Sequence, residues 1–165
     1  MDALYENIRN DHQIIKMAIH VVCGLRMDGT REILAIEPMY QESKESYAAL
    51  FDQLKARGIE STWLVVSDSH KGIVSAVNES FIGASWQRCK VHFMGNILAH
   101  VPAKQKKHFT GKLKQIWLQP DYQSAMADAN HLMNEFESRY LNAIRTLENG
   151  LEDSLQFFNF EQIDS

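Results

Sequence analysis

The chain has 165 residues, of which 45% are hydrophobic, and a formal net charge of −4 at pH 7. This composition predicts a globular domain with a substantial core, and the acidic balance by itself argues against a nucleic-acid binder. No apolar run approaches the ~20 residues of a membrane span, and residues 2–6 lack a signal-peptide pattern. Two cysteines give no disulfide framework. We therefore expect a cytoplasmic protein with no membrane partner.

The first forty residues predict antiparallel strands. Residues 2–8 are typical of the end of a strand, and residues 14–25 form a long, β-branched apolar run in which we expect His20 to be half-exposed. Asp28-Gly29 is a hairpin signal, and residues 31–39 alternate as an antiparallel partner would. The sequence therefore predicts a hairpin built on a long strand.

Helix and strand alternate in the next fifty residues. Apolar side chains at helical spacing in residues 47–54 precede a strand at residues 63–66, an amphipathic helix at residues 73–81 and a short strand at residues 86–89. Three strands followed by two crossover units predict an α/β mixed sheet with helices packed on it. The ribonuclease H-like fold has this layout, although the pattern alone does not single it out.

Asp68 directly follows the apolar strand at residues 63–66. Ligands of open α/β sheets bind beyond the carboxyl ends of the strands, which makes Asp68 a candidate for chemistry. Aspartate is also a favoured N-cap, so the alternative is that Asp68 only caps the following helix.

Beyond residue 91 the periodicity predicts helices only. Breaks fall near Pro102 and Pro120, a long amphipathic helix is expected over residues 122–140, and Asn149-Gly150 ends the helical region. The aromatic rings at residues 157–160 are expected to be exposed and to lack their packing partner.

Charge is distributed unevenly along the chain. Residues 86–116 contain no Asp or Glu, whereas residues 121–165 carry nine acids against two arginines. A basic centre of this kind indicates either a nucleic-acid surface or an ordinary solvated helical face. The basic residues concerned are Arg88, Lys90, Lys104, Lys106, Lys107, Lys112 and Lys114.

Two further constellations could carry chemistry. Asp2 and Asp68 are a candidate carboxylate pair for divalent metal ions, although spacing in the sequence cannot show that they meet. Cys89 and His92 have half the spacing of a zinc site, and no second pair with matching spacing follows. The alternative for this pair is a buried cysteine and a hydrogen-bonding histidine.

A combination of motifs resembles the mutator-type bacterial insertion-sequence transposases, which are DDE enzymes with a ribonuclease H-like core. The resemblance rests on residues 64–72 (LVVSDSHKG), 83–93 (GASWQRCKVHF), 96–98 and 2–9 (DALYENIR), together with the Asp28-Gly29 hairpin. It covers nearly the whole chain. It implies a partial ribonuclease H-like catalytic core at residues 1–92, a helical insertion at residues 93–150 and a truncated segment at residues 151–165.

The resemblance also implies metal-dependent cleavage and transfer of DNA strands at transposon ends. Asp2 and Asp68 would be the first two acids of the triad and would hold Mg²⁺ or Mn²⁺, with Cys89 and His92 close to the active site. The lysine-rich region would contact the phosphates of transposon-end and target DNA. The implied partners are DNA and either a second copy or a full-length transposase, in a bacterial, nucleoid-associated setting.

Three departures from the family pattern lead us to expect a catalytically incomplete chain. The third acid, a Glu in a Thr-Asn-rich motif, does not occur before Ser165, and Glu161 is not in that motif. From the resemblance we also expect the chain to lack the upstream half of the strand that bears Asp2 and the N-terminal DNA-binding region before it, and Gly95 stands where the family usually has an arginine. A non-catalytic remnant that binds DNA or a transposase is the alternative, and an unrelated α/β domain is a third.

Overall fold

The structure is a computed structural model that describes residues 1–10 and 13–160. It divides into two compact units, Met1–Trp86 and Gln87–Ser165, which are treated separately below. The domain limits predicted from the sequence stay a prediction.

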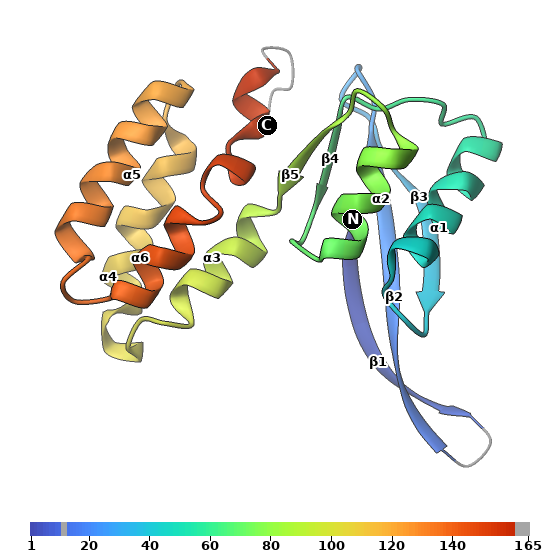
Figure 1. Ribbon diagram of the computed structural model, residues 1–165, viewed down its shortest axis with the longest axis horizontal. Coiled ribbons are helices and arrows are strands. Elements are labelled where there is room, and N and C mark those ends of the chain that lie inside the picture. The colour runs from blue at the N-terminus through green and yellow to red at the C-terminus, as the bar shows by residue number, and fades with distance from the viewer. Residues whose placement is uncertain (11–12, 161–165) are drawn as a thin grey trace. The chain divides into compact units, whose positions relative to one another are not determined.

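A three-stranded antiparallel sheet forms the first part of unit 1 (Figure 1). Its strands are β1 (Asp2–Asn10), β2 (Gln13–Leu25) and β3 (Arg31–Met39), in the order β1-β2-β3. The turn between β2 and β3 has Gly29 at φ 82°, with the Gly29 amide donating to the Arg26 carbonyl at 3.0 Å. Only glycine adopts this backbone region readily, so the predicted Asp-Gly hairpin is confirmed together with the long strand before it.

Two helices pack together against one face of this sheet (Figure 1). Helix α1 (Lys44–Ala56) begins at a capping box in which the Ser43 hydroxyl accepts from the Ser46 amide at 3.2 Å, and helix α2 (Lys71–Ser80) follows β4. The core contains the apolar helix residues that the helical spacing predicts to be buried, together with Val22 of β2 and Met39 of β3. Its buried members are Val22, Met39, Tyr47, Leu50, Phe51, Leu54, Ile73, Ala76, Val77 and Phe81.

Strands β4 (Leu64–Ser67) and β5 (Ser85–Arg88) pair in parallel as a second sheet. Helix α2 is the crossover between them, and the Trp86 indole donates to the Ser67 hydroxyl at 2.9 Å. The order of three strands, helix, strand, helix, strand is therefore as predicted, and the mixed α/β class is confirmed.

Unit 2 is helical in the part that the structure describes, as expected. It contains α3 (Lys90–Leu98), α4 (Ala103–Leu113), α5 (Tyr122–Phe136), α6 (Leu141–Glu148) and the 3-10 turns Lys114–Leu118, Glu152–Ser154 and Gln156–Asn159 (Figure 1). The helix expected at residues 122–140 ends at Phe136, and a new helix starts at Leu141. Over residues 1–10 and 13–160, no helix is both long and apolar enough to cross a membrane.

The aromatic segment near the C-terminus differs from the expectation. Phe157 and Phe158 are half-buried against the core of unit 2, with ring centroids 4.1 Å apart. Their partners lie within the chain itself, because the 3-10 turns after α6 fold the segment back onto the helices. The prediction that these two rings lack a packing partner is wrong.

Candidate catalytic site around Asp68

Asp68 lies in the loop that joins β4 to α2, and it is half-buried. One carboxylate oxygen, Oδ1, accepts from the His70 amide at 3.3 Å. The N-cap of α2 is instead His70, whose Nδ1 accepts from the Gly72 amide at 3.2 Å. The alternative that Asp68 is the N-cap is therefore wrong, because the N-cap lies two residues later and the aspartate closes a local turn before it.

Asp2 begins β1, where its backbone pairs with Val21 of β2. Its side chain lies outside the described residues, so the distance between the two predicted acids is untested. The backbone beside it is informative, since the Met1 nitrogen donates to the Val66 carbonyl oxygen of β4 at 2.7 Å. One hydrogen bond thus joins the start of β1 to β4, next to Asp2 and two residues before Asp68.

A second carboxylate, which sequence reasoning missed, stands in the loop between β3 and α1. Glu42 accepts hydrogen bonds from the Tyr5 hydroxyl at 2.5 Å and the Tyr47 hydroxyl at 2.7 Å. His20 Nε2 lies 3.3 Å from Glu42 Oε1, although its geometry does not make a hydrogen bond. We call Tyr5, His20, Glu42 and Tyr47 the Glu42 cluster.

The environment of the Glu42 cluster fixes its protonation. Burial raises the pKa of Glu42, but the hydrogen bonds from both tyrosines and the neighbouring histidines outweigh it, so the net pKa is lowered. The hydrogen bond to Glu42 and burial raise the pKa of Tyr5 to about 12, and burial followed by the same carboxylate raises that of Tyr47. Near neutral pH the carboxylate is ionised and both hydroxyls are protonated.

His20 is 3% exposed, so the prediction of a half-exposed strand histidine is wrong. Burial lowers its pKa, although Glu42 and Asp68 act in the opposite direction. The Tyr47 ring lies edge-on to His20 at 5.1 Å between centroids. His20 is buried because it points from β2 to the sheet face that α1 covers.

Cys89 and His92 lie in unit 2, at the start of α3. Cys89 is the N-cap residue of that helix but makes no side-chain capping bond, and the His92 side chain is exposed. Among the described residues no three His, Cys, Asp or Glu side chains form a group that could hold a metal ion. That Cys89 and His92 lie near the active site stays a prediction.

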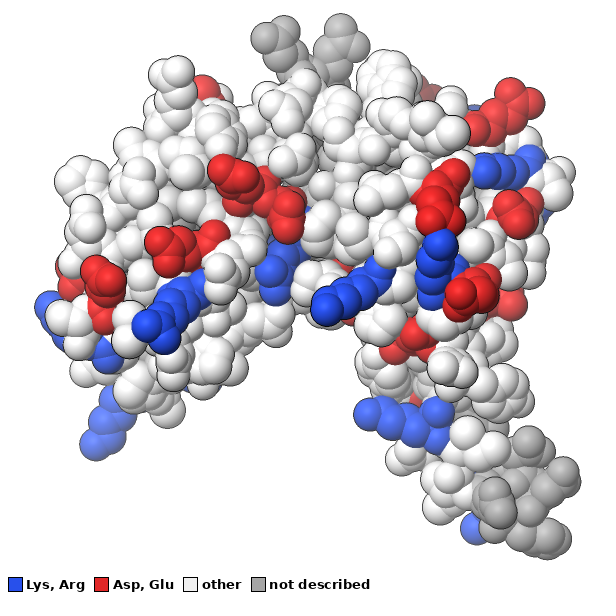
Figure 2. All heavy atoms as spheres, viewed as in Figure 1, with Lys and Arg blue, Asp and Glu red and all other residues white. Residues whose placement is uncertain are grey.

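The predicted basic residues fall into two groups. Two of them have partners, because the Lys112 ammonium lies 2.5 Å from the Glu135 carboxylate and the Arg88 guanidinium lies 4.3 Å above the Phe93 ring. The exposed members are Lys90, Lys104, Lys106, Lys107 and Lys114, and three of these lie on the first turns of α4. On the face drawn in Figure 2, basic and acidic side chains are interspersed.

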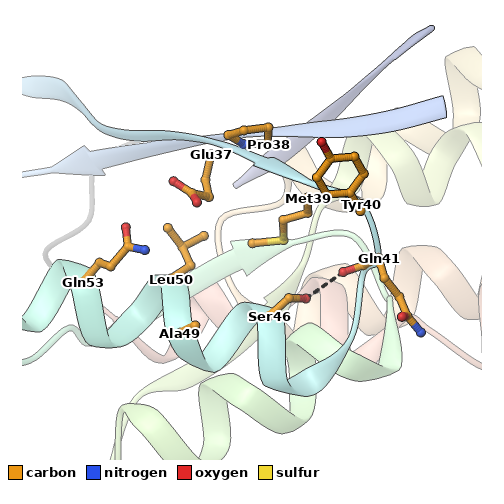
Figure 3. Close-up of a pocket in the computed structure, with 9 residues that line it drawn as sticks. All are labelled: Glu37, Pro38, Met39, Tyr40, Gln41, Ser46, Ala49, Leu50 and Gln53. Atoms are coloured by element: carbon orange, nitrogen blue, oxygen red, sulfur yellow. Dashed lines mark hydrogen bonds between the residues drawn. The ribbon is translucent and has the colours of Figure 1, made fainter. Parts of the chain in front are cut away.

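A surface pocket of unit 1 lies elsewhere (Figure 3). It has a volume of about 280 Å³ between the end of β3 and α1, and its charged residue is Glu37. In Figure 3 the Ser46 hydroxyl donates to the Gln41 carbonyl at its rim. Asp68 does not line it, and one carboxylate among apolar, amide and hydroxyl side chains does not make a catalytic constellation.

Comparison with known proteins gives one consistent family. A family model described as "Transposase, Mutator family" matches residues 1–164. The chain is 37% identical over 158 residues to a transposase for insertion sequence element IS256 in transposon Tn4001 from Staphylococcus aureus, covering 94% of this chain and 40% of the relative. It is 34% identical to the ISRM5 transposase of Rhizobium meliloti, covering 96% and 40%, and 30% identical to the IS1081 transposase of Mycobacterium tuberculosis, covering 96% and 38%. The chain thus spans about 40% of the length of these relatives.

Proposed function

The chain belongs to the Mutator family of transposases, and from this premise we propose that it contributes Asp2 and Asp68 to metal-dependent cleavage and transfer of DNA strands. The observation that carries the proposal is the hydrogen bond from the Met1 nitrogen to the Val66 carbonyl oxygen. It holds the backbone beside Asp2 next to β4, the strand that Asp68 directly follows.

We assign the two sheets to one ribonuclease H-like arrangement. The two sheets are separate by their strand pairing, β1-β2-β3 and β4-β5, and the hydrogen bond from Met1 to Val66 supports placing β1 beside β4. The proposed order would then be β3-β2-β1-β4-β5. In that order two acids stand on neighbouring strands, Asp2 at the start of β1 and Asp68 just after β4. Neighbouring carboxylates are what a site for two divalent ions requires.

The residues fit a hard divalent cation such as Mg²⁺ or Mn²⁺. Asp68 is half-buried, and its Oδ1 is oriented by the His70 amide, so the carboxylate is held by the backbone while it remains accessible. Asp2 would supply the second carboxylate. When bound, the metal ions would activate water or a terminal 3′-hydroxyl and stabilise the leaving oxygen.

Metal binding by the chain tests this proposal. Calorimetric titration with Mn²⁺ should show binding that Asp2→Asn and Asp68→Asn each abolish, because both carboxylates share the site. Asp52→Asn, an exposed acid on α1, is the matched control and should bind as the parent does. Absence of binding at millimolar metal, or loss with only one of the two substitutions, would contradict a shared site.

The DNA partner is supported by the exposed lysines of α4. Lys104, Lys106 and Lys107 are available for phosphate contacts, whereas Lys112 is already paired with Glu135. Each phosphate contact adds about 0.9 to the slope of log affinity against log salt, so replacing the three lysines with Gln should reduce the slope by about 2 to 3. Replacing Lys16, Lys55 and Lys71 with Gln removes the same charge elsewhere and should change the slope less.

A second candidate function is non-catalytic binding of DNA or of a complete transposase. The same exposed lysines favour it, and it needs neither Asp2 nor Asp68. Salt-dependent DNA binding that survives both aspartate substitutions, in a chain that binds no metal, would favour this candidate over the first.

A further inference from the structure

We propose that Glu42 is a positioning residue that fixes the β4–α2 loop and thereby orients the Asp68 carboxylate. This inference rests on the function proposed for Asp68. It concerns a side chain distant in sequence from both predicted acids, in a loop to which sequence reasoning gave no role.

Side chains from three elements surround Glu42, and two of them, Tyr5 and Tyr47, donate hydrogen bonds to it. Tyr5 comes from β1, His20 from β2 and Tyr47 from α1, and each places a polar atom within 3.3 Å of the carboxylate. Hydrogen bonds to an ionised carboxylate are about twice as strong as neutral ones. The Glu42 side chain is 14% exposed and Tyr47 is fully buried, so little water competes with the hydrogen bond from Tyr47, which fixes the loop that carries Glu42 to α1.

One route from Glu42 to Asp68 runs through side chains. The Tyr47 ring, whose hydroxyl is bound to Glu42, contacts the His70 ring at 5.9 Å between centroids. His70 in turn caps α2 through Nδ1, while its amide donates to Asp68. Three successive contacts therefore connect Glu42 with Asp68, the proposed metal ligand.

A second route runs through the backbone. A Cβ atom placed on Gly72 would lie 3.0 Å from both the Lys44 nitrogen and the Ser43 carbonyl carbon. The first turn of α2 thus packs directly on the two residues that follow Glu42, so closely that a side chain at position 72 would crowd their backbone. The Lys44 ammonium also lies 2.5 Å from the Glu79 carboxylate, which ties α1 to α2 again.

Amide hydrogen exchange on the whole chain tests the inference directly. The His70 amide reports its hydrogen bond to Asp68, and the Gly72 amide reports the cap of α2. In Glu42→Gln we expect both amides to exchange about tenfold faster, while amides in the middle of α1 and α2 stay within about twofold, because local opening is separate from global unfolding.

Two further variants separate positioning from general destabilisation. Tyr47→Phe keeps the ring against His70 but removes the hydroxyl, so it should accelerate the same two amides to a smaller extent. Glu60→Gln, an exposed acid before β4, is the matched control and should leave both amides unchanged. Unchanged exchange at His70 and Gly72 in Glu42→Gln, or equal acceleration of every amide of unit 1, would overturn the inference.

The metal titration keeps this test distinct from that of the proposed function. If the parent chain binds Mn²⁺, Glu42→Gln should weaken binding about tenfold, whereas Glu60→Gln should not. If the parent binds no metal, the proposed function fails, and the exchange of His70 and Gly72 still decides whether Glu42 orders the loop.

Discussion

Gly150→Ala should destabilise unit 2 by overpacking its core. Gly150 is buried after α6, and a Cβ atom there would lie 2.8 and 2.9 Å from Cε2 and Cζ of Phe93 and would also meet the Arg88 guanidinium. Carbon atoms prefer about 3.5 to 4.0 Å, so the ring would have to move by roughly 0.7 Å. Phe93 is fully buried and lies edge-on to Trp117 at 6.1 Å between ring centroids, so moving the ring disturbs a packed core.

The magnitude follows from two opposing terms. Overpacking a core costs about 1 to 3 kcal/mol, whereas replacing glycine by alanine gains about 0.4 to 1 kcal/mol by restricting the unfolded chain. With both terms near the middle of their ranges, the net free energy of unfolding should fall by about 1 to 2 kcal/mol. For a unit of this size that corresponds to a fall of roughly 4 to 16 °C in Tm.

Denaturant unfolding and thermal melting measure this effect, and the chain offers a matched control. Apart from its chain neighbours and the nearby backbone of α4 itself, no heavy atom of the described residues comes within 4 Å of a Cβ placed on Gly111 in α4. Gly111→Ala should therefore raise stability by about 0.5 to 1 kcal/mol, because glycine is unfavourable within a helix. A Gly150→Ala variant that is as stable as the parent would refute the packing argument.

The remaining predictions concern polar contacts. Because the hydrogen bond to Glu42 raises the folded-state pKa of Tyr5 from 10.0 to about 12, its contribution to stability should be full below pH 10 and lost as pH rises through about 12. Tyr5 is 52% exposed, so screening should limit this contribution to about 1 kcal/mol, and Tyr5→Phe should remove the alkaline dependence measured by denaturant titration. Because the folded-state pKa of Glu42 is lowered, its contribution to the free energy of unfolding is present above pH 4.5 and is lost as pH falls below that value. Glu42→Gln should therefore reduce the dependence of stability on pH in the acid range. In unit 2 the Trp117 indole donates to the buried Ser154 hydroxyl at 3.2 Å. Ser154→Ala should lower the free energy of unfolding, measured by thermal unfolding, by about 1 to 3 kcal/mol. A loss below about 0.5 kcal/mol would show that the indole finds another acceptor.

Local patterns predicted most of the secondary structure of unit 1. Tyr47, Leu50, Phe51 and Leu54 recur at helical spacing, and all four are at most 3% exposed in the folded chain. Asp28-Gly29 gave the hairpin because a positive φ at glycine is a property of the turn itself. Such features depend on neighbours in the sequence, so they can be predicted without knowing the tertiary structure.

The Glu42 cluster could not be predicted in this way. Glu42 meets Tyr5 across 37 residues and His20 across 22, and these contacts exist only after the sheet and α1 have assembled. The burial of His20 has the same origin, since an isolated strand does not reveal which face a helix will cover. A polar Glu-Ser pair before a helix indicates a helix start, but it does not indicate which side chains Glu42 will contact.

Strand β2 is paired on both sides over only part of its length, so its two ends should differ in their free energy of local opening. The register of β3 on β2 ends where Met39 pairs with Ala18, whereas the register of β1 continues past Asn7 and Lys16 (Figure 1). Beyond that point the hairpin has two strands, and a two-stranded ribbon in water is marginal by itself. The backbone at Lys16 should therefore open by local fraying, while the backbone at Val22 opens only when the core of unit 1 unfolds. The first protease cut in unit 1 should accordingly fall in this arm and leave the three-stranded region folded.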